Sequence, residues 1–255
     1  MIGIFRGALA GALLLFLGLA GAIAAEQKAL RVVATNTWTA AFARAAGIQD
    51  VVTLAPAELR HPAEYELKAS DVAALKGADL IVSTGFEVMA ARLAEAAGSQ
   101  NIRIIQIDAD YTLSIMRSSL LKLADAAGTL PQARASIAAL EEFEASWKEE
   151  LRARGLAGAP ILVHVFQRPL MEELGFTVKG VFGPAPLEAA QIARLSREKV
   201  SLVVDNWHNE VAAPLRETLP RVPYASLINF PGPDGTATLL DVMADNRKRL
   251  AAATP

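Results

Sequence analysis

Short β-branched runs alternate with helix-forming segments through most of this chain, and this alternation constrains the fold more than any other feature. Strands separated by a helix-length crossover pair in parallel, and helices then cover the faces of the sheet. In the first half, the strand candidates are residues 30–35, 51–54, 77–85 and 102–107, with helices at 39–47, 70–75 and 88–97. In the second half, strands at 161–163, 178–182, 200–204 and 225–228 alternate with helices at 169–174, 187–195, 211–218 and 238–251. The pattern predicts an α/β fold with parallel sheets.

Residues 131–155 interrupt this alternation. Pro131 opens a run rich in Ala, Glu, Lys, Arg and Leu, and Gly155 ends it. Proline in the first turn and glycine after the last are typical of a helix, here about 35 Å long at about 1.5 Å per residue. The segment is also compatible with an ordinary long surface helix. We predict two parallel-sheet α/β lobes, at 25–130 and 157–255, bridged by one long helix at 131–156.

The first 24 residues have the pattern of a secretory signal peptide. Arg6 gives a positive start, residues 7–22 are apolar, and Ala22-Ile23-Ala24 is a small-x-small cleavage site. The alternative is an uncleaved membrane anchor, for which the apolar stretch is short. We therefore expect a periplasmic protein, secreted through a cleaved signal peptide.

The composition narrows the range of partners. The chain has no cysteine, so disulfide bonds are excluded and stability outside the cytoplasm must come from the core. Its 25 basic residues nearly balance its 27 acidic residues, and no long basic run occurs. Nucleic acid is therefore not an expected partner, and we expect a monomer.

The chain has three histidines, His61, His164 and His208, and each lies in a different third of the sequence. His164 follows the strand at 161–163, and Asp205 follows the next strand but one, with His208 three residues later. Ligands of parallel α/β sheets bind outside the carboxyl ends of the strands. Three imidazoles and one carboxylate would complete a four-coordinate zinc site. Taken singly, His164 is also compatible with a structural role, and His61 with a solvated loop.

Enzyme motifs are scarce. The sequence has no G-x-S-x-G, H-E-x-x-H, P-loop or G-x-G-x-x-G pattern. An exported hydrolase using His208 and Asp205 is the least favoured alternative. The sequence therefore predicts a binding protein rather than an enzyme.

The chain resembles the zinc- and manganese-type periplasmic solute-binding proteins of ABC importers over most of its mature length. Residues 65–71 read Tyr-Glu-Leu-Lys-Ala-Ser-Asp, where that family reads Y-E-P-x-P-S-D, and an Ala-Asp-Leu strand follows at 78–82. His164, with Gly175 eleven residues later, matches the spacing of a second family segment. Asp205 stands where the family has its last acidic ligand. The resemblance implies that His164 and Asp205 are metal ligands, and together with the three histidines it predicts a metal site formed by His61, His164, Asp205 and His208.

The sequence departs from the family pattern at two ligands. The family's first histidine falls on Ala63, and His61 stands two residues earlier, where a shifted loop would let it take the same role. The family's second histidine is missing from residues 108–115, and His208, which has no family counterpart, could compensate. His164, in register and on a strand end, is the expected principal anchor.

The resemblance implies capture of a transition-metal ion, Zn²⁺ first and Mn²⁺ second, and its delivery to an ABC-type membrane permease. Lobes bridged by one stiff helix should move little, so we expect loop movement rather than a wide hinge. The alternative is a binding protein for a metal chelate or a small organic ligand. Trp38 and Trp207 would then line the pocket; otherwise both tryptophans pack in the core.

Overall fold

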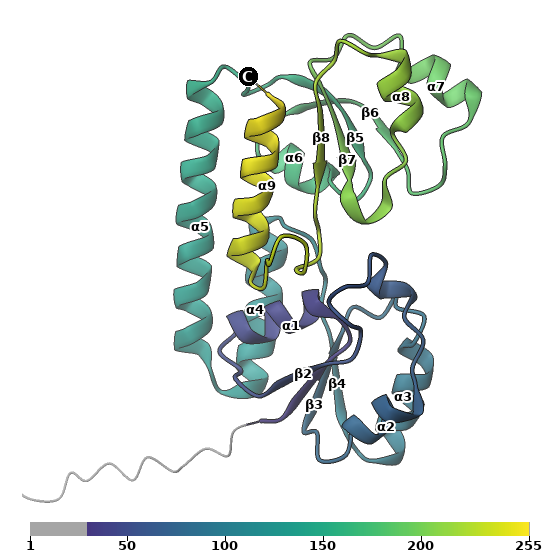
Figure 1. Cartoon of the computed structure of the whole chain (residues 1–255). Coiled ribbons are helices and arrows are strands. Elements are labelled where there is room, and N and C mark those ends of the chain that lie inside the picture. Colours follow the sequence, from purple (N-terminus) through teal and green to yellow (C-terminus); the bar gives the residue numbers. More distant parts are fainter. Residues whose placement is uncertain (1–29, 255) are drawn as a thin grey trace, which may run out of the picture.

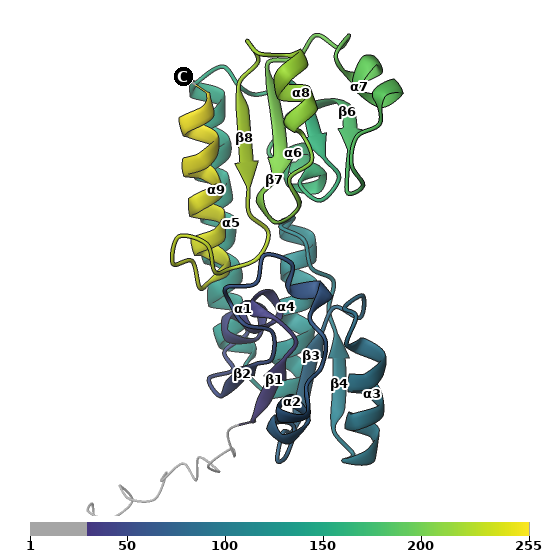
Figure 2. The same ribbon diagram turned by 45° about the vertical axis from the view of Figure 1, so that its right-hand side comes forward.

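The computed structural model describes residues 30–254, so the predicted signal peptide lies outside the described residues. Within this range the chain forms two four-stranded parallel sheets covered by helices, which confirms the predicted fold class. Figures 1 and 2 show the two lobes end to end, with one long helix beside both. In the described part, no helix is both long and apolar enough to cross a bilayer.

The first lobe has the strand order β2-β1-β3-β4. Its strands are β1 (Val32–Ala34), β2 (Val51–Thr53), β3 (Leu80–Ser83) and β4 (Arg103–Gln106). Its helices are α1 (Thr37–Ala45), α2 (Ala69–Ala74), α3 (Ala90–Ser99) and α4 (Leu113–Ala127), with a 3-10 turn η1 (Pro62–Glu64). The central strands β1 and β3 are buried along their whole length, as a sheet covered on both faces requires.

The second lobe repeats this topology, with the order β6-β5-β7-β8. Its strands are β5 (Pro160–His164), β6 (Thr177–Phe182), β7 (Leu202–Asn206) and β8 (Tyr224–Leu227). Its helices are α6 (Arg168–Glu173), α7 (Ala189–Leu195), α8 (Ala213–Thr218) and α9 (Leu239–Ala253), with a 3-10 turn η2 (Trp207–Asn209). The carboxyl ends of both sheets face the region between the lobes (Figure 2).

The long helix α5 (Leu130–Ala153) has 24 residues, about 36 Å at 1.5 Å per residue, and runs beside α9 from one lobe to the other (Figure 1). It is preceded by α4, a helix that our sequence analysis did not predict. The apolar spacing of Met116, Leu120 and Leu123 marks the buried face of α4. Gly128 ends the helix at a φ of 71°, a left-handed conformation that favours glycine.

One apolar core runs through both lobes. A single cluster of buried residues includes Phe42 of α1, Trp147 of α5, Val204 of β7 and Met243 of α9. A polar contact also joins the two lobes: the Thr37 hydroxyl donates a hydrogen bond to the Pro231 carbonyl at 2.7 Å. Separating the lobes would expose this core, so the structure favours small loop movements over a wide hinge.

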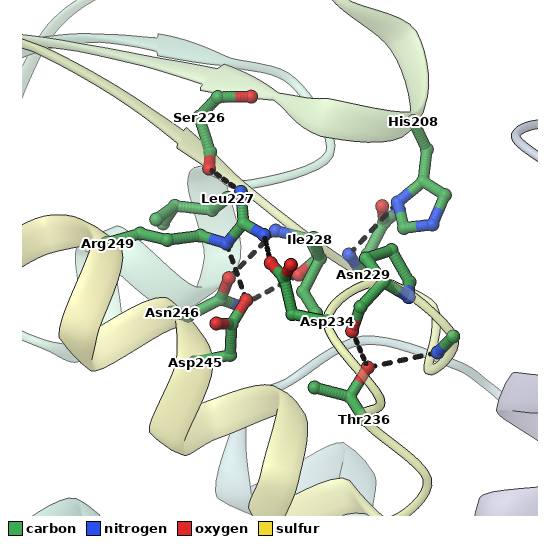
Figure 3. A network of polar contacts seen from close by, with 12 residues as sticks. His208, Ser226, Leu227, Ile228, Asn229, Asp234, Thr236, Asp245, Asn246 and Arg249 are labelled. Carbon is green, nitrogen blue, oxygen red and sulfur yellow. Dashed lines mark hydrogen bonds and ion pairs between the residues drawn. The ribbon is translucent and has the colours of Figure 1, made fainter.

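Asn246 of α9 fixes the segment that follows β8. Its side chain accepts a hydrogen bond from the Ile228 N–H and donates one to the Ile228 carbonyl, both at 2.8 Å, and it is fully buried (Figure 3). These two hydrogen bonds satisfy the backbone N–H and carbonyl of Ile228, which have no neighbouring strand to pair with once β8 ends. The segment thus held carries Asn229 and Phe230 into the space between the lobes.

We predict that Asn246→Ala lowers the free energy of unfolding by about 2–4 kcal/mol, because it leaves two buried backbone groups of Ile228 without partners. Lys248→Ala, on an exposed position of the same helix, is the matched control and should change it by less than about 0.5 kcal/mol. Urea unfolding followed by circular dichroism measures both. Equal effects of the two substitutions would contradict the assigned role of Asn246.

Candidate functional site

A cavity of about 450 Å³ lies between the lobes at the carboxyl ends of both sheets. We call it the inter-lobe cavity. The first lobe lines it with Trp38, Arg60, His61, Glu64, Phe86 and Asp110. The second lobe lines it with Phe166, Asn206, His208, Asn209, Asn229 and Phe230. Almost all of these residues follow a strand directly or stand in the loop after it, the usual place for a ligand site in parallel α/β sheets.

His61 enters the cavity from the loop between β2 and η1. The ring is exposed, and the backbone carbonyl of His61 accepts the Glu64 N–H that closes η1. The neighbouring Arg60 reaches across to the second lobe, where its Nε donates to the Trp207 carbonyl at 3.1 Å and its Nη2 pairs with Glu210 at 2.9 Å. We call these contacts the Arg60 clasp. The clasp holds the His61 loop against the second lobe.

His208 enters the cavity from η2, and only 4% of it is exposed. Asn206 positions the turn, because its side-chain oxygen accepts the His208 N–H at 2.9 Å and its Nδ2 donates to the Asn229 side chain at 3.0 Å. The ring stands edge-on to Phe230, with centroids 4.9 Å apart. Burial lowers the pKa of His208 to about 3, and the charge of His61 adds to the lowering. The imidazole is therefore neutral at pH 7, in the form that binds metals.

The ring nitrogens of His208 are not firmly occupied. Nδ1 accepts the backbone N–H of Asn229 at 3.4 Å, which is long for a hydrogen bond (Figure 3). The proton can therefore move to Nδ1 and leave the Nε2 lone pair for a ligand, at the cost of one weak contact.

His164 ends β5 and is fully buried, outside the lining of the cavity. Its Nδ1 accepts the Phe166 N–H at 3.2 Å, and its Nε2 pairs with Asn209 Oδ1 at 3.0 Å. Gly183 closes over the ring, and a Cβ at that position would lie 2.3 Å from Nε2. Burial also lowers the pKa of the His164 imidazole. Both ring nitrogens of His164 therefore have hydrogen-bond partners within the second lobe.

Asp205 is fully buried within the second lobe, and it too lies outside the cavity lining. Its carboxylate accepts the Ala212 N–H at 2.9 Å and the Val211 N–H at 3.2 Å. It also accepts the Tyr224 hydroxyl at 3.0 Å and its neighbour's N–H at 2.8 Å. Burial, and then the Asp205 charge, raise the pKa of Tyr224. Asp205 therefore organises the loop between η2 and α8.

The structure divides the four predicted ligands into two pairs. His61 and His208 share the inter-lobe cavity, whereas His164 and Asp205 are engaged within their own lobe. Across residues 30–254, no group of three or more His, Asp or Glu side chains is placed to hold a metal ion. A strand end fixes where a residue sits but not which way its side chain turns, and here the side chains of both residues turn to partners within the lobe.

The cavity also has aromatic walls, and the sequence did not lead us to expect the two phenylalanines among them. Phe86 of the first lobe is 60% exposed, and Phe166 of the second is 49% exposed. Trp38 lies deeper, stacked on Tyr111 at 5.3 Å and edge-on to Phe230 at 5.0 Å. Their sequence positions could have indicated this role, since Phe86 stands three residues after the end of β3 and Phe166 two residues after the end of β5.

The Trp38 indole N–H is a buried donor without an acceptor among the described residues. Such a donor costs free energy in the unliganded protein, and a ligand oxygen can recover it. Trp38 therefore has both of the roles expected for it, because it lines the cavity and is also buried in the core.

The fold is shared with several solved metal-binding proteins. The solute-binding protein FpvC of Pseudomonas aeruginosa, solved with Ni²⁺, is 20% identical, with a TM-score of 0.68 over 89% of this chain and 97% of its own. A Mn-bound periplasmic metal-binding protein of Candidatus Liberibacter asiaticus is 14% identical, with a TM-score of 0.64 over 89% and 100%. TroA, whose solved structure concerns metal-binding specificity, is 15% identical, with a TM-score of 0.65 over 89% and 99%. No protein-family model and no curated protein matches the sequence. At these identities the likeness shows the fold.

We predict that the free energy of unfolding falls as the pH drops below about 6.5, the usual histidine pKa in an unfolded chain. Because the pKa of His164 is lowered in the folded state, the unfolded chain binds a proton there that the folded chain resists. The stability is thus present above the unfolded pKa and is lost on acidification. Urea unfolding at pH 7.5, 6 and 5 should show a shallower loss for His164→Gln than for the wild type. An unchanged pH slope in the variant would contradict a buried neutral imidazole at this position.

Proposed function

We propose that this protein is an exported solute-binding protein of the metal-importer type. It captures a transition-metal ion in the inter-lobe cavity and delivers it to an ABC-type membrane permease. The proposal places the protein in the periplasm, in accord with the predicted signal peptide. The shared fold supports it, since two of the solved proteins named above carry nickel or manganese in their structures.

The observation that carries the proposal is the meeting of two imidazoles from opposite lobes in one cavity. His61 comes from the loop after β2 and His208 from the turn after β7. A metal ion bound by both rings would link the lobes, and the bound state would differ from the free state in the His61 loop.

His164 and Asp205 act in this proposal as positioning residues rather than ligands. His164 holds Asn209, and Asp205 holds the backbone on both sides of η2. Both therefore fix the turn that presents His208. Outer groups of this kind orient the ligands of a metal site and change its affinity without touching the ion.

The donor set favours Zn²⁺, with Mn²⁺ as the second choice. Neutral imidazole nitrogen suits zinc, whereas manganese prefers an oxygen-rich sphere. Glu64 and Asp110 also line the cavity and give it negative charge, against the single positive charge of Arg60. The balance favours a cationic cargo.

A hydrolytic function has less support. The Asp205 carboxylate is occupied by backbone N–H groups and by Tyr224, so it does not orient His208 as a catalytic acid–base pair would require. The binding function therefore stays the better interpretation.

We predict that the mature protein binds one Zn²⁺ per chain and that His61→Ala and His208→Ala each weaken binding at least tenfold, because each removes a nitrogen donor. His164→Gln should have a smaller effect, since this residue only positions the turn. Elemental analysis and zinc competition titrations at pH 7.5 measure these values, after thermal unfolding has shown that each variant is folded.

Two outcomes would contradict this prediction. A wild-type protein that neither carries nor takes up zinc would remove the proposed function. If His164→Gln proved more damaging than both alanine variants, His164 would be the anchor, as its sequence register first suggested.

We predict that Arg60→Ala increases the zinc dissociation rate severalfold, because the clasp holds the His61 loop closed over the cavity. Exposed ion pairs contribute little to stability, so the unfolding free energy should change by less than about 1 kcal/mol. Arg152→Ala, which breaks an exposed pair with Glu149 on α5, is the matched control. Stopped-flow release of zinc to a chelator measures the rates. The same dissociation rate in both variants would show that the clasp does not govern release.

A further inference from the structure

The inter-lobe cavity is larger than a bare metal ion needs. Its volume is about 450 Å³, whereas one water molecule occupies about 30 Å³ in the liquid. Cavities of roughly 300–1,000 Å³ are typical sites for small organic molecules. Among residues 30–254, no third His, Asp or Glu is placed to complete a metal site with the two imidazoles, so a four-coordinate zinc ion needs two further donors.

The walls of the cavity suit an aromatic body better than a hydrated ion. Phe86 and Phe166 expose more than two fifths of their surface and come from opposite lobes. A hydrated ion gains nothing from such surfaces. A flat organic ring buries them and also gains ring–ring contacts of about 0.5–1.5 kcal/mol each.

One residue of the cavity lining has a hydrogen-bond donor that lacks an acceptor. Trp38 lines the cavity and is 4% exposed, and its indole N–H has no partner in the described part of the chain. A bare metal cation cannot accept this hydrogen bond. A chelator with an anionic oxygen can both bind the metal and accept the N–H.

From these three observations we infer that the cargo is a metal ion carried by a small aromatic chelator with an oxygen donor. This inference rests on the proposed function and names its substrate class. His61 and His208 supply two donors to the ion, and the chelator supplies the remaining two. The aromatic body is held by Phe86 and Phe166, and its oxygen accepts the hydrogen bond of Trp38.

The test uses Zn²⁺ with 8-hydroxyquinoline, an aromatic chelator that binds zinc through one nitrogen and one oxygen. The mature protein is titrated with Zn²⁺ alone, with the chelator alone, and with an equimolar mixture. Calorimetry gives the affinities, and native mass spectrometry gives the stoichiometry. We expect a 1:1:1 complex, with zinc held at least tenfold more tightly in the presence of one equivalent of chelator.

Variants separate the two parts of the site. Phe86→Ala and Phe166→Ala should each weaken the ternary complex at least fivefold and leave the affinity for Zn²⁺ alone within twofold. Both side chains are exposed, so the fold should tolerate their loss. Val72→Ala, an exposed apolar position on α2 outside the cavity lining, is the matched control and should change neither affinity.

The results that would contradict the chelator inference can be distinguished from the result that would contradict the proposed function. If 8-hydroxyquinoline only withdraws zinc and no ternary complex forms, the inference is overturned while the proposed metal-binding function stands. If the chelator binds equally well without zinc, the inference is also overturned, because the cargo is then an organic molecule alone. If neither Zn²⁺ nor the mixture binds, the proposed function itself fails.

Discussion

The contact between Trp38 and Phe230 is the interaction on which the rest of the site depends. It joins α1 of the first lobe to the segment after β8 of the second, and Tyr111 stacks on the same indole ring. The Tyr111 hydroxyl donates to the Asn229 carbonyl at 3.1 Å, so the contact is fixed by polar as well as apolar groups. Because these residues belong to the core shared by both lobes and α5, they hold the carboxyl ends of the two sheets toward each other. The inter-lobe cavity is the space that this arrangement leaves.

Two buried histidines at neighbouring strand ends have different roles because their hydrogen bonds differ. His164 has both ring nitrogens in contacts of 3.2 Å or shorter, and Gly183 excludes other atoms from Nε2. His208 has one long contact, and its ring lines the cavity. Burial lowers the pKa of both imidazoles, but only His208 lines the cavity. Neutrality is therefore necessary for a metal ligand and does not by itself identify one.

The fold could be predicted from the sequence, because β-branched runs and helix signals are local and each strand lies within a few residues of its expected place. Helix α4 was missed although Met116, Leu120 and Leu123 have helical spacing. The site was harder to predict. Sequence position located His61 and His208 in the loops that line the cavity, but it could not show that the carboxylate of Asp205 turns to the backbone of residues 211 and 212. Side-chain direction and the presence of Phe86 and Phe166 in one cavity depend on tertiary packing, which one sequence does not reveal.

A site with few protein donors changes how a carrier selects its cargo. Among divalent ions, copper binds most nitrogen and oxygen sites more tightly than zinc or manganese, so donor chemistry alone gives poor discrimination. The proposed chelator would add a second criterion, because its shape would have to fit between Phe86 and Phe166 and its oxygen would have to reach Trp38. Selection then acts on the whole complex and not on the ion. Release would also be easier for such a cargo, since breaking the two proposed bonds from His61 and His208 would free a metal that stays coordinated by its chelator. The permease would thus receive a coordinated ion, and the carrier would not have to strip a complete coordination sphere.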